Sequence, residues 1–186
     1  MLALCYAEDL WQASTASTWG STAAERGRPF PCDGLVAEPA ATLFRAVDVA
    51  APPAVVFRWL CQLRVAPYSY DWIDNFGRQS PPQLTPGLDD LQRGQTVMGV
   101  FELVDFERDR HLTAVTRPSV LDGVFGRFAA SYVVVPRGDT RARLVVKVLV
   151  RYGRGPIGWL TRGLFPWGDL VMMRKQLLNL KRLAET

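Results

Sequence analysis

The chain has 186 residues, of which 48% are hydrophobic and 22% charged, a composition typical of one globular domain rather than of a disordered chain. The 22 basic and 18 acidic residues leave a net charge of +4, a surplus too small to indicate a nucleic-acid-binding protein. One histidine and three cysteines are fewer than most metal sites and histidine-dependent dyads need, so we expect neither a metal nor a cofactor.

The cellular compartment is predicted from the cysteines and from the apolar segments. The cysteines are odd in number and widely spaced, which favours reduced thiols in the cytoplasm. The apolar first seven residues run directly into Glu8 and Asp9 without a preceding cationic segment, unlike a signal peptide. Arg162 and Asp169 interrupt the richest apolar stretch, residues 157–173, so we expect no stable membrane insertion.

Residues 1–40 are predicted to form an N-terminal arm that docks on a single domain at 41–186. The arm is rich in serine, threonine, proline and glycine, as irregular segments are. It also carries Trp11 and Trp19, and we expect these indoles to be covered, because exposing an indole to water is unfavourable.

The domain begins with a strand and a helix. Residues 42–49 are β-rich, and two prolines then precede a helix at 54–63 with one apolar face. A long connection follows, for which we predict short helical turns at 70–76 and 85–91.

Four further strands are predicted, at residues 96–107, 111–117, 126–136 and 141–152. Hairpin-forming turns join them. In the last strand, valines alternate with Arg143, Lys147 and Arg151, which predicts an antiparallel sheet with one dry and one solvated face.

A helical region is predicted from the glycines at 153–158 to the end of the chain, with Pro166 kinking or restarting it, and residues 167–184 form its long amphipathic helix. Its apolar arc contains Met172, Met173, Gln176, Leu177, Leu180, Leu183 and Ala184. A G-x-G-x-x-G pattern at 153–158 lacks the returning parallel strand of a dinucleotide site, so we interpret it as a turn.

Glu102 is the candidate acid/base. It alternates with Val100, Val104 and Phe106, and on a dry face its pKa would rise. A β-bulge could instead turn Phe101, Leu103 and Asp105 inward, and the sequence leaves both orientations open.

Other polar groups could contact a ligand in an apolar cavity. Tyr132 and Gln176 lie among apolar residues, either as ligand-binding groups or as partnered core residues. In the segment RVAPYSYDWIDNFGR at 64–78, Tyr70 is a candidate hydrogen-bond donor, and Tyr68, Asp71 and Trp72 are candidate ligand contacts. The alternative is that this segment closes one end of the sheet.

The order of these elements resembles that of the START-like, helix-grip superfamily (SRPBCC). The amino-acid sequence is most similar to the bacterial polyketide cyclase/dehydrase-like branch of this superfamily. The resemblance covers about residues 40–185. The segments that carry it are FRAVDVAAPP at 44–53, RVAPYSYDWIDN at 64–75, FELVDFERDRHL at 101–112 and PWGDLVMMRKQLLNLKRL at 166–183. It implies an α+β fold in which a curved antiparallel sheet wraps around the C-terminal helix and leaves a cavity.

Two functions follow from that resemblance. One is a cofactor-independent enzyme of secondary metabolism that cyclises or dehydrates a polyketide-like molecule, with Glu102, Tyr132 and Tyr70 as catalytic groups. The other is a non-catalytic carrier or sensor of a hydrophobic ligand or lipid. In both, Phe106, Met172, Met173, Gln176 and Leu180 would line the cavity, and the protein would be a monomer or homodimer. A titrating carboxylate in the cavity would favour the enzyme.

Overall fold

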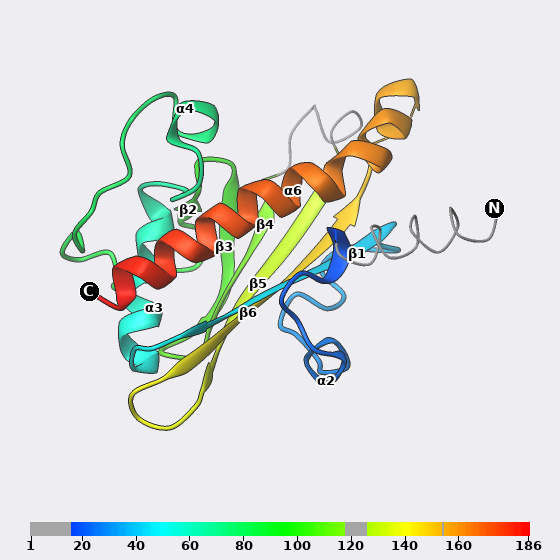
Figure 1. The fold of residues 1–186 in the computed structure, drawn as a ribbon. Helices are drawn as coiled ribbons and strands as arrows, with labels where there is room; N and C mark the ends of the chain where they lie inside the picture. The colour runs from blue at the N-terminus through cyan, green and yellow to red at the C-terminus, as the bar shows by residue number, and fades with distance from the viewer. Residues whose placement is uncertain (1–15, 118–125, 154) are drawn as a thin grey trace, which may run out of the picture.

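The computed structural model describes residues 16–117, 126–153 and 155–186. Its centre is an antiparallel six-stranded sheet in the order β1-β6-β5-β4-β3-β2, which curves around a long helix (Figure 1). The strands are β1 (Ala41–Val49), β2 (Thr96–Val97), β3 (Phe101–Glu107), β4 (His111–Thr116), β5 (Arg127–Pro136) and β6 (Ala142–Arg151). This α+β architecture is the one predicted from the sequence.

Two departures from the predicted strands reshape one end of the sheet. The expected strand at 96–107 is two strands, because Met98 and Gly99 turn the chain with positive φ angles of 49° and 75°. A bulge between Leu103 and Asp105 then shifts the pairing of β3 with β4. The segment at 85–91, predicted as a helical turn, forms only turns and bends.

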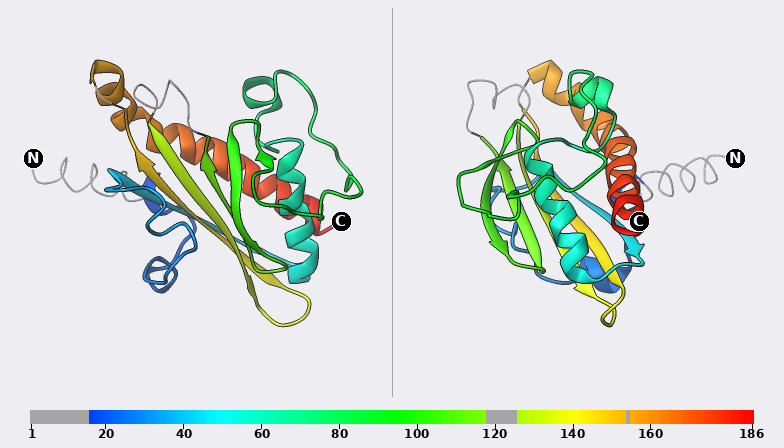
Figure 2. Two further views of the ribbon diagram at one scale, coloured as in Figure 1. Left: turned by 180° about the vertical axis from the view of Figure 1, so that it is seen from behind. Right: turned by 90° about the vertical axis from the view of Figure 1, so that its left-hand side faces the viewer.

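The helices α3 (Pro53–Cys61) and α6 (Gly155–Ala184) lie on the concave face of the sheet, and α4 (Asp71–Asp74) lies beside α6 (Figure 1). The helix α3 continues into a single 3₁₀ turn at Gln62–Arg64, and α4 is one short turn. The helix α6 crosses the sheet from end to end (Figure 2). It starts within the glycine-rich turn predicted at 153–158 and continues through Pro166, whose carbonyl oxygen accepts a hydrogen bond from Arg45 Nη2 at 3.4 Å.

The main core lies between α3, the C-terminal half of α6 and the sheet. Leu43, Val47, Leu144 and Val146 face it from β1 and β6, and Leu177 is fully buried against them. Because the C-terminal half of α6 buries its apolar arc here, it fixes the position of the helix over the sheet.

The convex face of β1, β5 and β6 is also dry, contrary to the solvated face predicted from the alternation in β6. Phe30, Cys32 and Val36 pack there on Phe44 and Val145. The N-terminal segment therefore adds an outer layer to this half of the sheet.

The structure describes one of the two tryptophans of the predicted arm. Trp19 is partly buried and packs against the main core, as expected for a covered indole. Its carbonyl oxygen also accepts a hydrogen bond from the backbone N–H of Ala46 on β1 at 3.1 Å. Trp11 lies outside the described residues.

Two basic residues that the alternation placed in solvent hold the outer layer. Arg143 is buried and donates to Glu25 at 2.8 Å and to Asp48 at 3.0 Å. Lys147 pairs with Asp33 and lies 5.3 Å from the centre of the Phe30 ring. Glu25 also completes a capping box with Thr22 at the start of α2 (Ala23–Arg26).

We predict that Glu25→Gln lowers the free energy of unfolding at pH 7 by about 3 kcal/mol. The Arg143 hydrogen bond is the largest cause of the low pKa of Glu25, which is about 2 instead of 4.5. A lowered carboxyl pKa stabilises the fold above pH 4.5, and this stabilisation is lost as pH falls towards 2.

Urea unfolding of Glu25→Gln between pH 3 and 7 measures the effect, and Asp48→Asn is the matched control. Asp48 contacts the same guanidinium, but its side chain is 79% exposed, so its loss should change stability by less than about 1 kcal/mol. Equal losses in the two variants would contradict the prediction.

Candidate active site

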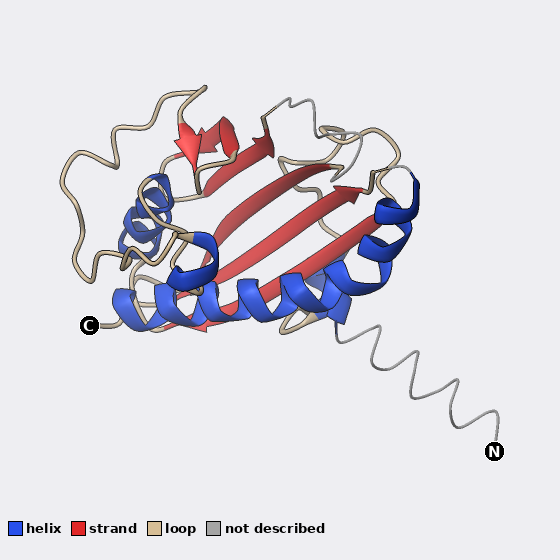
Figure 3. Ribbon diagram, turned by 90° about the horizontal axis from the view of Figure 1, so that it is seen from above, coloured by secondary structure: helices blue, strands red, loops and turns tan. Residues whose placement is uncertain are grey.

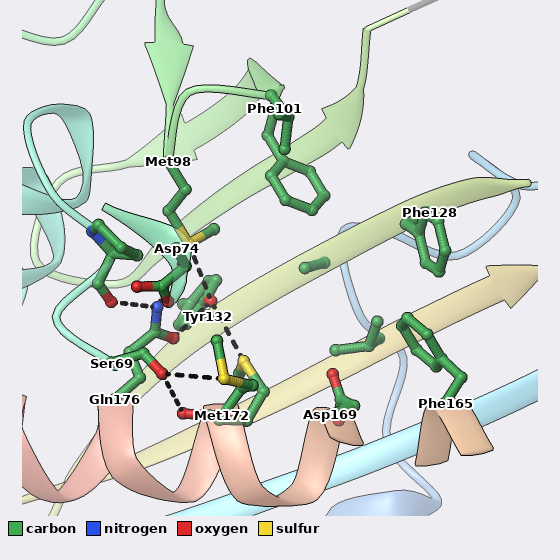
Figure 4. Close-up of a pocket in the computed structure, with 15 residues that line it drawn as sticks. Ser69, Asp74, Met98, Phe101, Phe128, Tyr132, Phe165, Asp169, Met172 and Gln176 are labelled. Carbon is green, nitrogen blue, oxygen red and sulfur yellow. Dashed lines mark hydrogen bonds between the residues drawn. The ribbon is translucent and has the colours of Figure 1, made fainter. Parts of the chain in front are cut away.

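A cavity of about 220 Å³ lies between α6 and the sheet, near the middle of the helix. It is mostly apolar, with a few polar groups that converge on it (Figure 4). Its lining residues are Pro67, Ser69, Asp74, Met98, Val100, Phe101, Phe128, Ala130, Tyr132, Val148, Phe165, Asp169, Met172, Met173 and Gln176.

One wall of the cavity is a hydrogen-bonded chain from sheet to helix to loop. The Tyr132 hydroxyl on β5 donates to Gln176 Oε1 on α6 at 2.8 Å, and Gln176 Nε2 donates to the Pro67 carbonyl at 2.7 Å. Tyr132 and Gln176 are 1% and 2% exposed. Burial raises the pKa of Tyr132 above its usual value, so the phenol stays protonated and its oxygen keeps acceptor capacity for a ligand hydroxyl.

Methionine sulfur atoms lie close to these hydrogen-bonded residues. Met98 and Met173 place their Sδ atoms 3.9 and 3.7 Å from the Tyr132 hydroxyl, and Met172 lies beside Ser69, with Sδ 3.6 Å from its hydroxyl. Thioether side chains are polarizable and adapt to irregular shapes, so this wall can fit apolar ligands of different outline.

The second polar feature is a buried ion pair at the other end of the cavity. Arg45 on β1 donates to the Asp169 carboxylate at 2.7 Å, and their side chains are 0% and 9% exposed. Arg45 also donates to the Phe44 carbonyl at 2.8 Å, whereas its Nε has no partner within the described ranges. Desolvation raises the pKa of Asp169 to about 6, although Arg45 acts in the opposite direction.

A second carboxyl group lines the cavity from α4. Asp74 Oδ1 is buried and has no hydrogen-bond partner in the described part of the chain. Burial raises the pKa of Asp74, against the effects of the Ser69 hydroxyl and of its own backbone N–H. The cavity therefore contains two carboxyl groups, both with pKa values above the usual one.

Four of the residues predicted from the sequence line this cavity. Tyr132, Met172, Met173 and Gln176 come together around it, and Tyr132 with Gln176 forms a direct contact that the sequence left undefined.

Glu102 does not line the cavity, and of the two orientations that the sequence left open, the structure has the one that points it away from the cavity. Its neighbour Phe101 points into the cavity instead, and Leu103 is fully buried in the core. Strand alternation places Glu102 on the opposite face, where it is half-buried. Because of the bulge after Leu103, the Phe106 side chain packs against the core on the concave side. The apolar residues from Val100 to Phe106 therefore belong to two different pairing registers with β4.

The candidate residues that the sequence offered in the segment 64–78 do not line the cavity. Tyr68 is 2% exposed and packs edge-on against Trp59 in the core. Asp71 accepts hydrogen bonds from Ser80, Trp72 is 76% exposed, and the Tyr70 ring lies 6.0 Å from Lys175 Nζ.

Two further predicted contacts, Phe106 and Leu180, pack in the core without lining the cavity. Both lie on the concave side of the sheet, so the predicted face is correct, but they pack in the core away from the cavity.

The sequence-based reasoning missed Asp169 and Arg45. The available signal was an acidic residue inside the apolar stretch 157–173 and an arginine between Leu43 and Val47 on an inward strand face. Two opposite charges on dry faces of elements that pack together predict a buried pair.

The described ranges contain no group of three or more histidine, cysteine or acidic side chains that could hold a metal ion. His111 lies outside the cavity and hydrogen-bonds to Asp105 at 3.0 Å. The proton-transfer groups of the cavity are therefore carboxyl and phenol groups.

We predict that Arg45→Met and Asp169→Asn each lower the free energy of unfolding by about 3–5 kcal/mol, because each leaves a buried polar group unpaired. The double variant should lose much less than the sum of the two. Urea unfolding of all three variants gives this double-mutant cycle, and additive losses would show that the two groups do not form a pair.

No protein-family model and no curated protein matches this chain. Solved structures do resemble it. The Zhui aromatase/cyclase from Streptomyces sp. R1128 is 14% identical, with a TM-score of 0.50 over 77% of this chain and 93% of that chain. The protein TTHA0849 from Thermus thermophilus is 16% identical, with a TM-score of 0.49 over 77% and 96%.

Norcoclaurine synthase from Thalictrum flavum, solved in complex with dopamine and hydroxybenzaldehyde, is 13% identical, with a TM-score of 0.43 over 76% of this chain and 84% of that chain. At such identities the likeness concerns the fold alone. The curved antiparallel sheet and the long C-terminal helix, together with the likeness to the aromatase/cyclase at a TM-score of 0.50, show that this chain has the helix-grip fold.

Proposed function

We propose that the protein binds a small apolar, polyketide-like molecule in the cavity between α6 and the sheet and promotes its cyclisation and dehydration. The observation that carries this proposal is the pairing of apolar walls with a buried carboxyl group, Asp169, whose pKa is about 6. A carrier of apolar ligands needs the walls but has no use for a titrating group there.

The dimensions favour a compact ligand. Pockets for drug-sized molecules usually measure ~300–1,000 Å³, and this cavity of about 220 Å³ is smaller. It therefore suits a molecule of one or two rings, smaller than a typical drug-sized ligand. Phe101, Phe128 and Phe165 offer flat surfaces to such rings, and the Phe128 and Phe165 rings already stack at 4.9 Å.

The proposed chemistry is an intramolecular aldol reaction. The Asp169 carboxylate takes a proton from a methylene group between two carbonyls, and the resulting enolate carbon forms a bond to a carbonyl carbon of the same molecule. The oxygen of that carbonyl receives the proton back from Asp169. Loss of the new hydroxyl group with a neighbouring hydrogen then releases one water and leaves a carbon–carbon double bond in the ring.

The cavity residues have complementary tasks in this reaction. Arg45 keeps part of the Asp169 population ionised near neutral pH, and the Tyr132 oxygen accepts a hydrogen bond from a ligand hydroxyl. The apolar walls hold the chain folded, which converts a rare encounter of its two ends into a frequent one.

We predict that Met173→Trp weakens binding of the neutral dye N-phenyl-1-naphthylamine at least tenfold, because an indole would fill the space beside Tyr132. Dye fluorescence titration and a thermal melt measure binding and folding. Arg182→Trp adds the same indole to an exposed position of the same helix and should bind like the parent. Unchanged binding in a folded Met173→Trp variant would show that the dye does not bind in this cavity.

We predict that the protein accelerates ring closure of the nine-carbon tetraketone with alternating carbonyl and methylene groups. The rate should rise with pH around the Asp169 pKa of about 6, since the base is the ionised form. Arg45→Met should move this rise to higher pH, because Arg45 lowers that pKa.

The double variant Arg45→Met/Asp169→Asn, which removes both charges together, should lose about 10²-fold in rate. Product absorbance gives the rates. If the double variant keeps the parent rate, Asp169 is not the base. If the parent itself gives no acceleration while binding the dye, the protein is a carrier.

A further inference from the structure

Most exposed large apolar residues of the described ranges lie on α6 or in and next to α4. Eleven large hydrophobic residues of the described ranges are exposed, and only Leu35 and Val65 lie apart. The other nine form what we call the mouth patch: Trp72, Ile73, Phe76, Val100, Trp159, Leu160, Leu164, Trp167 and Val171. Their exposure reaches 95% at Phe76 and 78% at Trp159, and such clusters usually mark an interaction site.

The largest part of the mouth patch is one face of the first half of α6. At ~100° per residue, Leu160, Leu164, Trp167 and Val171 fall within an arc of about 60°. They are 43–63% exposed, whereas Leu177 and Leu180 in the second half are 0% and 2% exposed. The same helix therefore buries its apolar side at one end and, within the described ranges, leaves an apolar stripe without a partner at the other.

Part of the patch borders the cavity, whereas the α6 stripe lies on the outer face of that helix, opposite Phe165, Asp169 and Gln176 on the helical projection. Val100 belongs to both the patch and the cavity, since it is 62% exposed and also lines the cavity. Asp74 on α4 and Phe165 on α6 line the cavity from the elements that carry the rest of the patch. Both elements rise on the same side of the molecule in Figures 1 and 2, and Figure 3 looks down on that side.

The charges beside the stripe are positive. Arg162, Arg174 and Lys175 are exposed on α6, and Arg174 and Lys175 flank the stripe on the helical projection. Asp169 is the single acidic residue between Gly155 and Leu180, and it is buried against Arg45. Lys175 reaches the Tyr70 ring next to α4, so a cation lies between the two apolar parts of the patch.

We propose that the mouth patch docks on an anionic lipid bilayer, in the boundary between headgroups and acyl chains. A helix face with a tryptophan and leucines between cations has the composition that binds in that boundary zone without crossing the membrane. No helix in the described ranges is long and apolar enough to span a bilayer. The docking goes beyond the proposed function and brings the cavity, which Val100 of the patch borders, close to a bilayer in which apolar ligands dissolve.

Vesicle flotation tests the docking, with phosphatidylcholine vesicles compared with vesicles that also contain phosphatidylglycerol. We expect binding to the anionic vesicles, weakened by salt. Trp159→Gln/Leu164→Gln should lower it at least tenfold. Arg174→Gln/Lys175→Gln should lower it about 25-fold, from about fivefold per cation, and only on anionic vesicles. Leu35→Gln/Val65→Gln removes two exposed apolar side chains outside the patch and should bind like the parent.

Three outcomes would overturn the docking: no binding of the parent, equal losses in the Leu35/Val65 control, or a dimer that the Trp159/Leu164 variant converts to monomer in sedimentation experiments. The last would identify a second copy as the occupant. Dye binding in vesicle-free buffer is measured in parallel. Because neither pair of patch substitutions lines the cavity, dye binding should persist in them, and its loss in the parent would contradict the proposed function independently of the docking.

Discussion

The ion pair between Arg45 and Asp169 ties the middle of α6 to the edge strand of the sheet, and the architecture of the cavity depends on it. On the C-terminal side of Asp169, the helix is held by the hydrogen bonds of Gln176 and by apolar contacts with the core. The cavity occupies the interval between these two attachments. A fully apolar interface would close on itself, because apolar side chains pack to high density. Two polar attachments at fixed positions keep the helix and the sheet apart between them.

The same ion pair explains why a carboxyl group in this cavity can titrate near neutral pH. Burial alone would push the pKa of Asp169 far upward, and a neighbouring guanidinium alone would push it down. The two effects oppose each other here, and the pKa settles at about 6. Asp74 experiences burial without an arginine partner. One cavity thus offers two carboxyl groups with different electrostatic surroundings, which is how acid and base roles are separated in proteins.

The sequence predicted the fold well because the fold rests on local periodicity. The alternation in β6 and the apolar arc of α6 are both statements about which residues share a face, and the structure confirms both. The orientation of Glu102 stayed open in the sequence, because a bulge changes the face of a strand halfway along it and alternation alone does not place the bulge, which lies at Val104. The Arg45–Asp169 pair was missed because its members are 124 residues apart. The solvated face was misassigned at Arg143 and Lys147, whose partners Glu25 and Asp33 lie in a segment without periodicity.

The outer layer formed by Phe30, Cys32 and Val36 also determines which wall of the cavity can yield. Strands β1, β5 and β6 are the middle of a three-layer stack, with apolar side chains packed on both faces. Displacing them outward would separate the outer cluster and strain the Arg143 and Lys147 contacts together. Within the described ranges the opposite wall has no such backing, since α4 and the turn at Val100 carry exposed side chains. A ligand larger than the closed cavity would therefore gain its space by moving α4 and this turn, while the strands keep their positions.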